Sequence, residues 1–220
     1  MTFRIAIRAG VAVLGVAALI GCGSGGTAAN NGTAVAQAVP ANPVQAALAE
    51  FDQVCGRVAD RDDYVAAAPA AGWTAFEPVA DSPVGRLIAM GQNVGRETAA
   101  EIGGGQFRHE NSAFRKTVGG RELILLVSFV ELPRTQASTE CRVLDQAAPA
   151  PTEAEISAWT QTPPTRRTRE QGVTGFEWQP GFRPGFSNIS VVHLDPTSPL
   201  RAQLPVVGLG ITSMQGPPAA

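Results

Sequence analysis

The spacing of apolar residues changes near Phe107, and this change constrains the fold more than any other feature of the chain. Before it, apolar side chains such as Val44, Phe51 and Val58 fall at helical spacings of three and four and form one stripe. After it, Leu123 to Val130 is nearly continuous in apolar residues, as in a central strand covered on both faces. Helices followed by strands are typical of the α+β class.

The individual elements follow from local signals. Helices are predicted over residues 44–58, from residue 64 to Gly72, after Ser82-Pro83, and after Thr152, which begins a capping box with Glu155. Extended segments are predicted at residues 112–118, 121–132, 139–145, 175–179, 187–194 and 204–213, with a Gly119-Gly120 turn joining the first two and an exposed connection at residues 162–171. We therefore predict an α+β domain with a mostly antiparallel sheet of about five to six strands and the N-terminal helices packed on one face.

The N-terminus reads as a secretory signal. Arg4 and Arg8 supply a positive start, and the uncharged apolar run from Ala9 to Ile20 ends in small residues. The run is about twelve residues long, whereas a membrane-spanning helix needs roughly twenty. We therefore interpret residues 1–21 as a signal peptide and not as a permanent membrane span.

The end of this run, Leu19-Ile20-Gly21-Cys22, resembles the lipobox of bacterial lipoproteins. The resemblance implies cleavage before Cys22, a diacylglycerol on its sulfur and an acylated amino terminus, which agrees with the need for more than one acyl chain for stable anchoring. Because Gly23 and not Asp follows, the resemblance favours the outer membrane, with the protein facing the periplasm. The alternative is an ordinary signal peptide with a chance cysteine.

The rest of the chain divides into three parts. Residues 22–43 carry the lipid and are rich in small and polar residues, which predicts a flexible tether. Residues 44–215 are enough for a single periplasmic domain with a core of its own. Residues 216–220 are predicted to be a disordered tail.

Two cysteines remain once Cys22 is committed to lipid. In an oxidising compartment we expect Cys55 and Cys141 to form a disulfide that pins the first helix to the sheet. Two buried free thiols or a redox-active pair are the alternatives, and a redox pair would usually show C-x-x-C spacing.

A second resemblance covers residues 50–145. The pattern Phe51-x3-Cys55, then Gly72-Trp73, then the Gly119-Gly120 hairpin leading to Cys141 resembles a family of small bacterial envelope proteins that has no assigned activity. The resemblance implies the α+β fold and supports the disulfide. It implies no catalytic residue, cofactor or ligand.

Charge excludes one class of partner. Removal of residues 1–21 takes away Arg4 and Arg8 and leaves 15 basic and 19 acidic residues, a net charge of −4. An acidic domain is a poor binder of nucleic acid through bulk charge. The Gly103–Gly105 run is not a phosphate-binding loop, because no Lys-Ser/Thr pair follows it, and we expect no cofactor.

The chain has two histidines, and these are the candidate residues for catalysis or metal binding. His109 is followed by Glu110, and His193 lies two residues before Asp195 at the end of a predicted strand. Two convergent ligands fall short of a zinc site, and no G-x-S-x-G nucleophile motif is present. A triad through His193 stays formally possible, because such triads are spatial and not sequential.

Two surface patterns could bind a partner. One is an aromatic segment with three Gly-Phe pairs, and the other is an arginine cluster. Their candidate residues are Phe176, Trp178, Phe182 and Phe186, and Arg166, Arg167 and Arg169. Exposed aromatics are good interface anchors. The alternatives are a hairpin that sends Phe176, Trp178 and Phe186 into the core, and a solvated arginine loop.

The leading hypothesis is a non-enzymatic lipoprotein, held to the membrane through Cys22, that binds another envelope protein or a cell-wall component. The competing hypothesis is a small periplasmic hydrolase that uses His193 or His109. A purely structural envelope protein is the third possibility.

Overall fold

The computed structural model describes residues 42–102, 107–133 and 137–216. The predicted signal peptide, the predicted lipidation site Cys22 and nearly all of the predicted tether lie outside these ranges, as do residues 217–220 of the predicted tail. The described residues all belong to one compact unit, Ala38–Ala220.

Four α-helices occur among the described residues, and each begins at a capped position. They are α1 (Pro43–Val54), α2 (Arg61–Ala70), α3 (Pro83–Glu101) and α4 (Glu153–Thr160), with a short 3-10 helix at Pro199–Ala202. The side chains of Asn42, Asp60, Ser82 and Thr152 each accept a backbone N–H of the first turn. Such caps satisfy donors that have no partner inside the helix. The predicted Ser82 cap and the Thr152–Glu155 capping box are both confirmed.

The strands form a single antiparallel sheet. They are β1 (Thr74–Ala75), β2 (Arg108–Val118), β3 (Arg121–Glu131), β4 (Ser138–Asp145), β5 (Arg166–Glu170), β6 (Val173–Trp178), β7 (Asn188–Leu194) and β8 (Gly208–Gln215). Their order in the sheet is β1-β2-β3-β4-β8-β7-β6-β5. The α+β class is thus correct. The sheet has eight strands among the described residues, and not five to six.

Both unpredicted strands are the edges of the sheet. β5 falls within residues 162–171, so the prediction that these residues form a connection is wrong. It pairs with β6 from Arg166↔Glu177 to Glu170↔Val173. An edge strand with little burial has no alternation of apolar residues to reveal it, and charged residues are common there. β1 has only two residues, and both are exposed.

The predicted hairpin is confirmed. β2 and β3 pair from Val118↔Arg121 to Arg108↔Glu131 across the Gly119-Gly120 turn. Both glycines have positive φ, 57° and 78°, which a two-residue turn of this kind requires and which glycine adopts without strain.

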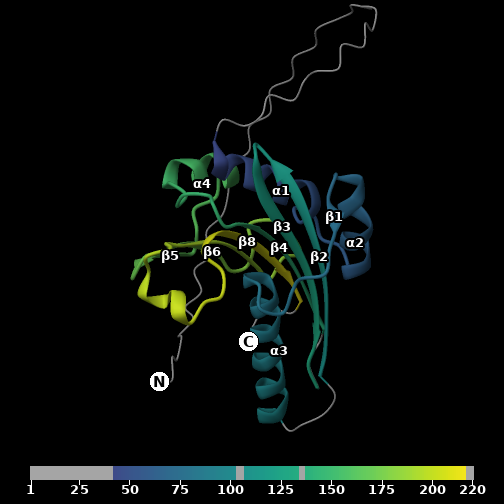
Figure 1. The fold of residues 1–220 in the computed structure, drawn as a ribbon. Coiled ribbons are helices and arrows are strands. Elements are labelled where there is room, and N and C mark those ends of the chain that lie inside the picture. The colour runs from purple at the N-terminus through teal and green to yellow at the C-terminus, as the bar shows by residue number, and fades with distance from the viewer. Residues whose placement is uncertain (1–41, 103–106, 134–136, 217–220) are drawn as a thin grey trace, which may run out of the picture. The chain divides into compact units, whose positions relative to one another are not determined.

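The main core lies between one face of the sheet and helices α1, α2 and α4. Leu125, Val143 and Ile211 of neighbouring strands face it together with Phe51 of α1 and Ile156 of α4, and all are almost completely buried. Figure 1 shows α1 and α4 along one side of the curved sheet, with α3 on the opposite side.

Helix α3 covers the second face of the sheet. Its Val84 packs with Ile124 and Leu144, which alternate with the core residues of β3 and β4 and therefore point the other way. The prediction that the N-terminal helices share one face is therefore wrong for α3. The physical reason is that β3 and β4 are apolar on both faces, so that the second face also needs a cover.

The disulfide is confirmed. Cys55, which caps the end of α1, is bonded to Cys141 of β4, with their Cα atoms 5.4 Å apart. It ties the first helix to a central strand, as the sequence predicts.

Candidate functional site

A groove lies at one edge of the sheet, and we call it the edge groove. Its lining comprises Val65 of α2, residues 75–78 and 80, residues 85, 88, 89 and 92 of α3, and residues 109 and 111–114 of β2, around a volume of about 800 Å³. Because consecutive strand residues point to opposite faces, a cavity lined by the run 111–114 meets both faces of β2. The edge groove therefore lies beside the free edge of β2, between α2 and α3.

β1 leaves most of this edge open. It pairs with β2 only at Thr74↔Arg115 and Ala75↔Phe114, and the Phe76 N–H then donates to the Ala113 carbonyl at 3.0 Å. The chain then turns away through Pro78 toward the start of α3, since proline has no N–H to continue a ladder. Residues 108–112 of β2 have no neighbouring strand on that side within the described chain.

His109 and Glu77 are the titratable residues in the lining of the groove, and His109 belongs to β2. Burial lowers the pKa of its imidazole, and the Glu140 carboxylate opposes that shift only in part. Its Nδ1 is buried and has no hydrogen-bond partner. The other edge of the ring faces Gly91 of α3, where a side-chain carbon would lie 3.5 Å from Cε1 and 4.0 Å from Nε2. Since the neutral imidazole carries one N–H, it offers one donor and one acceptor here.

The side of the groove toward α3 is mainly apolar, and polar side chains of β2 lie beside it. Phe76 and Ile88 pack against the cluster of Val84, Ile124 and Leu144, and the Arg115 guanidinium lies 5.7 Å from the centre of the Phe76 ring. The Asn111 side chain is oriented by the neighbouring strand, because its Oδ1 accepts a hydrogen bond from the Ser128 hydroxyl of β3 at 2.8 Å. A wall of this kind can hold an apolar group and still orient it through polar contacts.

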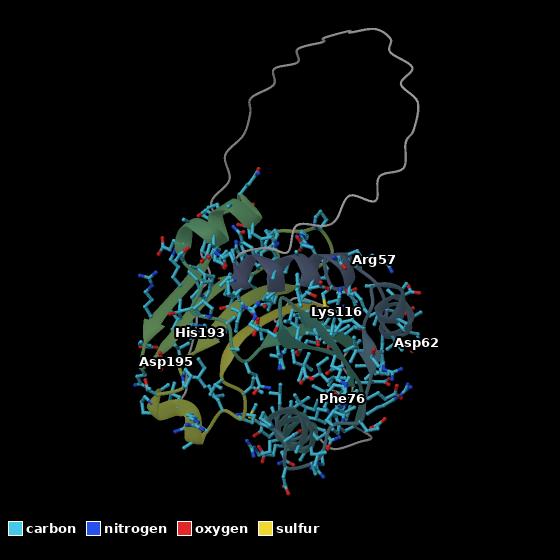
Figure 2. All side chains as sticks on the ribbon, turned by 45° about the horizontal axis from the view of Figure 1, so that its top comes forward. Arg57, Asp62, Phe76, Lys116, His193 and Asp195 are labelled. Atoms are coloured by element: carbon cyan, nitrogen blue, oxygen red, sulfur yellow. A yellow bond between two sulfur atoms is a disulfide. The ribbon has the colours of Figure 1, made fainter. Side chains whose placement is uncertain are left out.

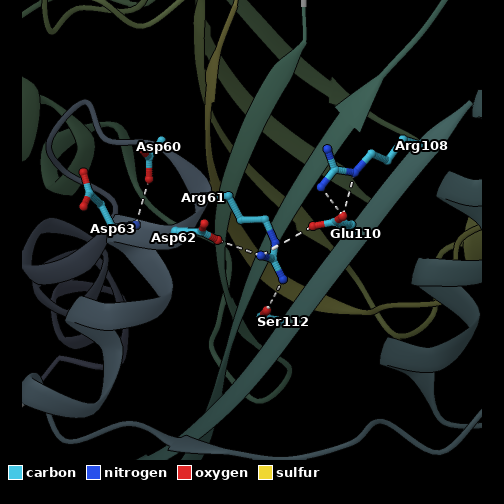
Figure 3. A network of polar contacts seen from close by, with 7 residues as sticks. All are labelled: Asp60, Arg61, Asp62, Asp63, Arg108, Glu110 and Ser112. Atoms are coloured by element: carbon cyan, nitrogen blue, oxygen red, sulfur yellow. Dashed lines mark hydrogen bonds and ion pairs between the residues drawn. The ribbon is translucent and has the colours of Figure 1, made fainter.

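On the α2 side of β2, charged residues lie next to the groove, in a neighbouring pocket, while Val65 is the α2 residue that lines the groove itself. Figure 3 shows Arg61 reaching from the start of α2 to β2, where its Nη2 donates to the Ser112 hydroxyl at 3.0 Å. The same guanidinium lies 3.5 Å from the Glu110 carboxylate and 2.8 Å from that of Asp62. Its Nε is buried without a partner. The two sides of the free edge therefore differ in chemistry, apolar at α3 and ionic at α2.

The aromatic residues proposed as anchors are mostly part of the core. Phe176, Trp178 and Phe186 are 1–4 % exposed and lie in the main core, as the hairpin alternative predicted. Phe182 is partly buried, and its ring centre lies 5.1 Å from that of Trp178. The other aromatic neighbour of both rings is Trp159 of α4. In this conformation the segment presents no row of exposed aromatic side chains.

The arginine cluster lies on the opposite edge of the sheet from the groove. Arg166, Arg167 and Arg169 are exposed on β5. The last two lie 4.0 Å from the Glu153 carboxylate at the start of α4. Exposed charge on an edge strand hinders pairing with another sheet, which is a sufficient structural role for this cluster.

His193 lies far from the edge groove. Figure 2 shows it with Asp195 at the opposite side of the domain from Phe76. It is 6 % exposed on β7, and the hydroxyl and amide of Thr197 hold the pKa of Asp195 below its usual value. Within the described residues, no hydrogen bond joins His193 or His109 to a serine hydroxyl or a carboxylate.

Two further observations concern the described ranges alone. No group of three or more His, Cys, Asp and Glu side chains there is arranged to hold a metal ion. Every helix in these ranges falls short of the length or apolar character that crossing a bilayer requires.

Comparison with protein-family models, curated proteins and solved structures finds no match for this chain. The resemblances to lipoproteins and to small envelope proteins therefore stay predictions from the sequence.

Sequence reasoning named His109 but missed the groove around it. The groove exists because α3 and the segment after β1 meet β2 from different sides, and no local pattern specifies that meeting. One signal in the sequence was Pro78, which limits the length of an extended segment at residues 73–76. Such a short segment can cover only part of the long strand beside it.

Proposed function

We propose that this protein is a membrane-anchored lipoprotein of the cell envelope whose folded domain is a non-enzymatic binding module for another envelope component. We place the binding site in the edge groove. The observation that carries this proposal is a sheet edge left open between two helices, with a partly desolvated imidazole and an apolar wall beside it. Concave sites that combine apolar walls with a few polar groups are the usual binding sites of proteins.

The proposed cellular location rests on the sequence and agrees with the presence of a disulfide in the fold. The signal-like residues 1–21 and the lipobox-like ending at Cys22 support export and anchoring, on the periplasmic side of the outer membrane. The Cys55–Cys141 disulfide supports the same address, since such bonds persist in oxidising compartments and are rare in the cytosol.

Binding is favoured over hydrolysis by the surroundings of the two histidines. A nucleophilic site needs a base within hydrogen-bond reach of a nucleophile and a third group that orients the base. Among the described residues, neither imidazole has such a pair of partners. His109, which lines the edge groove, is well placed to contact a bound molecule.

Photo-crosslinking in native cells tests the proposal. A photoreactive amino acid replaces Gln92, which lines the groove, or Val94, which lies on the same helix, is 56 % exposed and does not line the groove. We expect a discrete adduct from position 92 and none from position 94. The absence of an adduct at position 92, or the same adducts from both positions, would contradict a binding site in the edge groove.

A further inference from the structure

We infer that the edge groove binds an extended polypeptide segment, which pairs with the free edge of β2 as an added strand. This inference rests on the proposed function and names the class of partner. It depends on three features of the described residues: which backbone groups face the groove, how β1 already uses the same edge, and how the two walls differ.

The first feature is the direction of the backbone groups of β2. The Ala113 carbonyl accepts the Phe76 N–H, so the polar backbone groups of Ala113 face the outer edge. By the alternation of an antiparallel ladder, those of Asn111 and His109 face it too, and those of Glu110 and Ser112 face β3. The two-residue turn agrees with this assignment. Val118, which pairs with Arg121 at the turn, is an even-numbered residue of β2 like Glu110 and Ser112, and its backbone groups face β3.

These outward groups have no partner in the described chain. No backbone hydrogen bond there involves the N–H or C=O of Asn111 or of His109 on the outer side. Each outward-facing residue thus presents one N–H donor and one C=O acceptor to the edge. Successive outward-facing residues are about 6.6 Å apart along the strand. An extended peptide backbone presents the same groups at the same spacing, which makes it the complementary partner for such an edge.

The second feature is the precedent set by β1. Residues 74–76 already occupy the outer side of residues 113–115, so a strand fits on this edge between the flanking elements. The groove continues the position of β1 along the edge of β2, beyond the point where the chain turns away at Pro78. An added segment of about five residues would extend the existing strand position along residues 108–112.

The third feature is the contrast between the walls, which specifies the side chains of the segment. Successive side chains of an added strand point alternately toward the two faces. Those toward α3 would meet Phe76, Ile88 and Ala89. Those toward α2 would meet Val65 and Ser112, whose hydroxyl accepts a hydrogen bond from Arg61. We therefore expect alternating apolar and polar side chains, with the apolar ones at the α3 wall.

A binding experiment with the full lipidated protein in detergent micelles tests the inference. The probe is a random octapeptide display library, followed by one synthetic peptide of the enriched sequence. Asn111→Pro removes an outward N–H while leaving the β2–β3 ladder intact, since edge strands accept proline where the N–H faces solvent. Asn111→Ala is the matched control, because it loses the same side chain and keeps the N–H. We expect Asn111→Pro to weaken binding at least tenfold and Asn111→Ala less than threefold.

A second measurement keeps the test valid if Asn111→Pro fails to fold. Methyl groups are placed on single backbone nitrogens of the peptide, and the natural protein is used. Strand addition predicts a period of two: methylation at alternate positions weakens binding at least tenfold, and methylation at the positions between changes it less than threefold.

Three outcomes would overturn the inference. They are no enrichment of peptides over the Asn111→Pro variant, insensitivity to backbone methylation, and pairing of the edge with a second copy of the chain, seen as a dimer that Asn111→Pro abolishes. A lipid or glycan adduct from position 92 in cells would also overturn it while leaving the proposed function intact. No adduct at position 92 would remove the proposed function itself.

Discussion

His109 shows at the residue scale how the groove differs from ordinary surface. Its ring lies against α3 beside Gly91, its Nδ1 has no partner, and burial lowers its pKa. The surroundings therefore favour the neutral ring. A neutral imidazole can meet a peptide backbone through hydrogen bonds without the cost of desolvating a charge.

The lowered pKa predicts a pH dependence of folding. Because the folded pKa lies below the ordinary value of 6.5, the unfolded chain takes up this proton first as the pH falls. The stability that the neutral ring contributes is thus present above about pH 6.5 and is lost as the pH falls through that value toward the folded pKa. We expect urea unfolding between pH 7.5 and 5.5 to show a smaller loss for His109→Gln than for the natural protein. Equal losses would contradict the burial of this imidazole.

Lys116 makes a second prediction at the residue scale. Its Nζ donates to both Glu50 carboxylate oxygens, at 2.8 and 2.7 Å, and to the Ala71 carbonyl at 2.8 Å, so that it joins α1, the end of α2 and β2. The side chains are 21 % and 9 % exposed. Lys116→Ala leaves the buried Glu50 carboxylate unpaired. We expect it to lower the unfolding free energy by about 2–4 kcal/mol, somewhat less than for a pair in which both groups are fully buried.

The control for Lys116→Ala is the double variant with Glu50→Gln, measured by denaturant unfolding. Because no charge is left unpaired, its loss should be smaller than the sum of the two single losses. Additive losses would show that the two groups act independently, against the contact described.

At the scale of elements, α3 shows how glycines can set a packing distance. A side-chain carbon at Gly95 would lie 2.3 Å from the Phe107 ring, whereas one at Gly91 would have only ordinary contacts. Glycine within a helix costs about 1 kcal/mol relative to alanine. The same substitution should therefore have opposite signs at the two positions.

We expect Gly91→Ala to raise the unfolding free energy by about 0.5–1 kcal/mol, through helix propensity and a less flexible unfolded chain. Gly95→Ala should lower it by about 1–3 kcal/mol, because Phe107 has to move. Thermal unfolding of the two variants measured side by side gives the comparison. A gain at both positions would show that Phe107 does not pack on Gly95.

The elements also show which parts of the fold the sequence could predict. The six strands with a buried face were predicted, because alternating or continuous apolar residues marked each of them. The edge strands β1 and β5 were missed, since neither has more than slight burial and no apolar pattern reports pairing at an edge. For the candidate site, the sequence pointed to His109 only as one of two histidines that a hydrolase could use, while the groove depends on how α3 and β1 meet β2.

At the scale of the whole molecule, the disulfide links the two halves of the sequence. It joins residues 86 positions apart, the end of α1 to the centre of the sheet. The chain-entropy relation gives about 4–5 kcal/mol for a closed loop of this length. We expect the Cys55→Ala/Cys141→Ala variant, and the natural protein under reducing conditions, to lose similar amounts in denaturant unfolding. A loss below about 1 kcal/mol would show that the unfolded chain gains little freedom.

Within the sheet, the β5 edge and the face of the main core are protected from pairing or contact with other chains, whereas the β2 edge is open. Charged residues occupy the β5 edge, helices cover the main core, and only the β2 edge beside α3 combines free backbone groups with an apolar wall among the described residues. An unprotected sheet edge invites pairing with other chains. A protein that keeps one open between two helices has a surface suited to selective pairing.

Amide hydrogen exchange tests this account most directly, because it reads the free edge residue by residue. In the free protein we predict that the His109 and Asn111 amides exchange at least tenfold faster than those of Glu110 and Ser112. The bound peptide should then slow the first two at least tenfold and leave the others unchanged. Equal protection of all four amides in the free protein, or no change at His109 and Asn111 on peptide binding, would contradict the account.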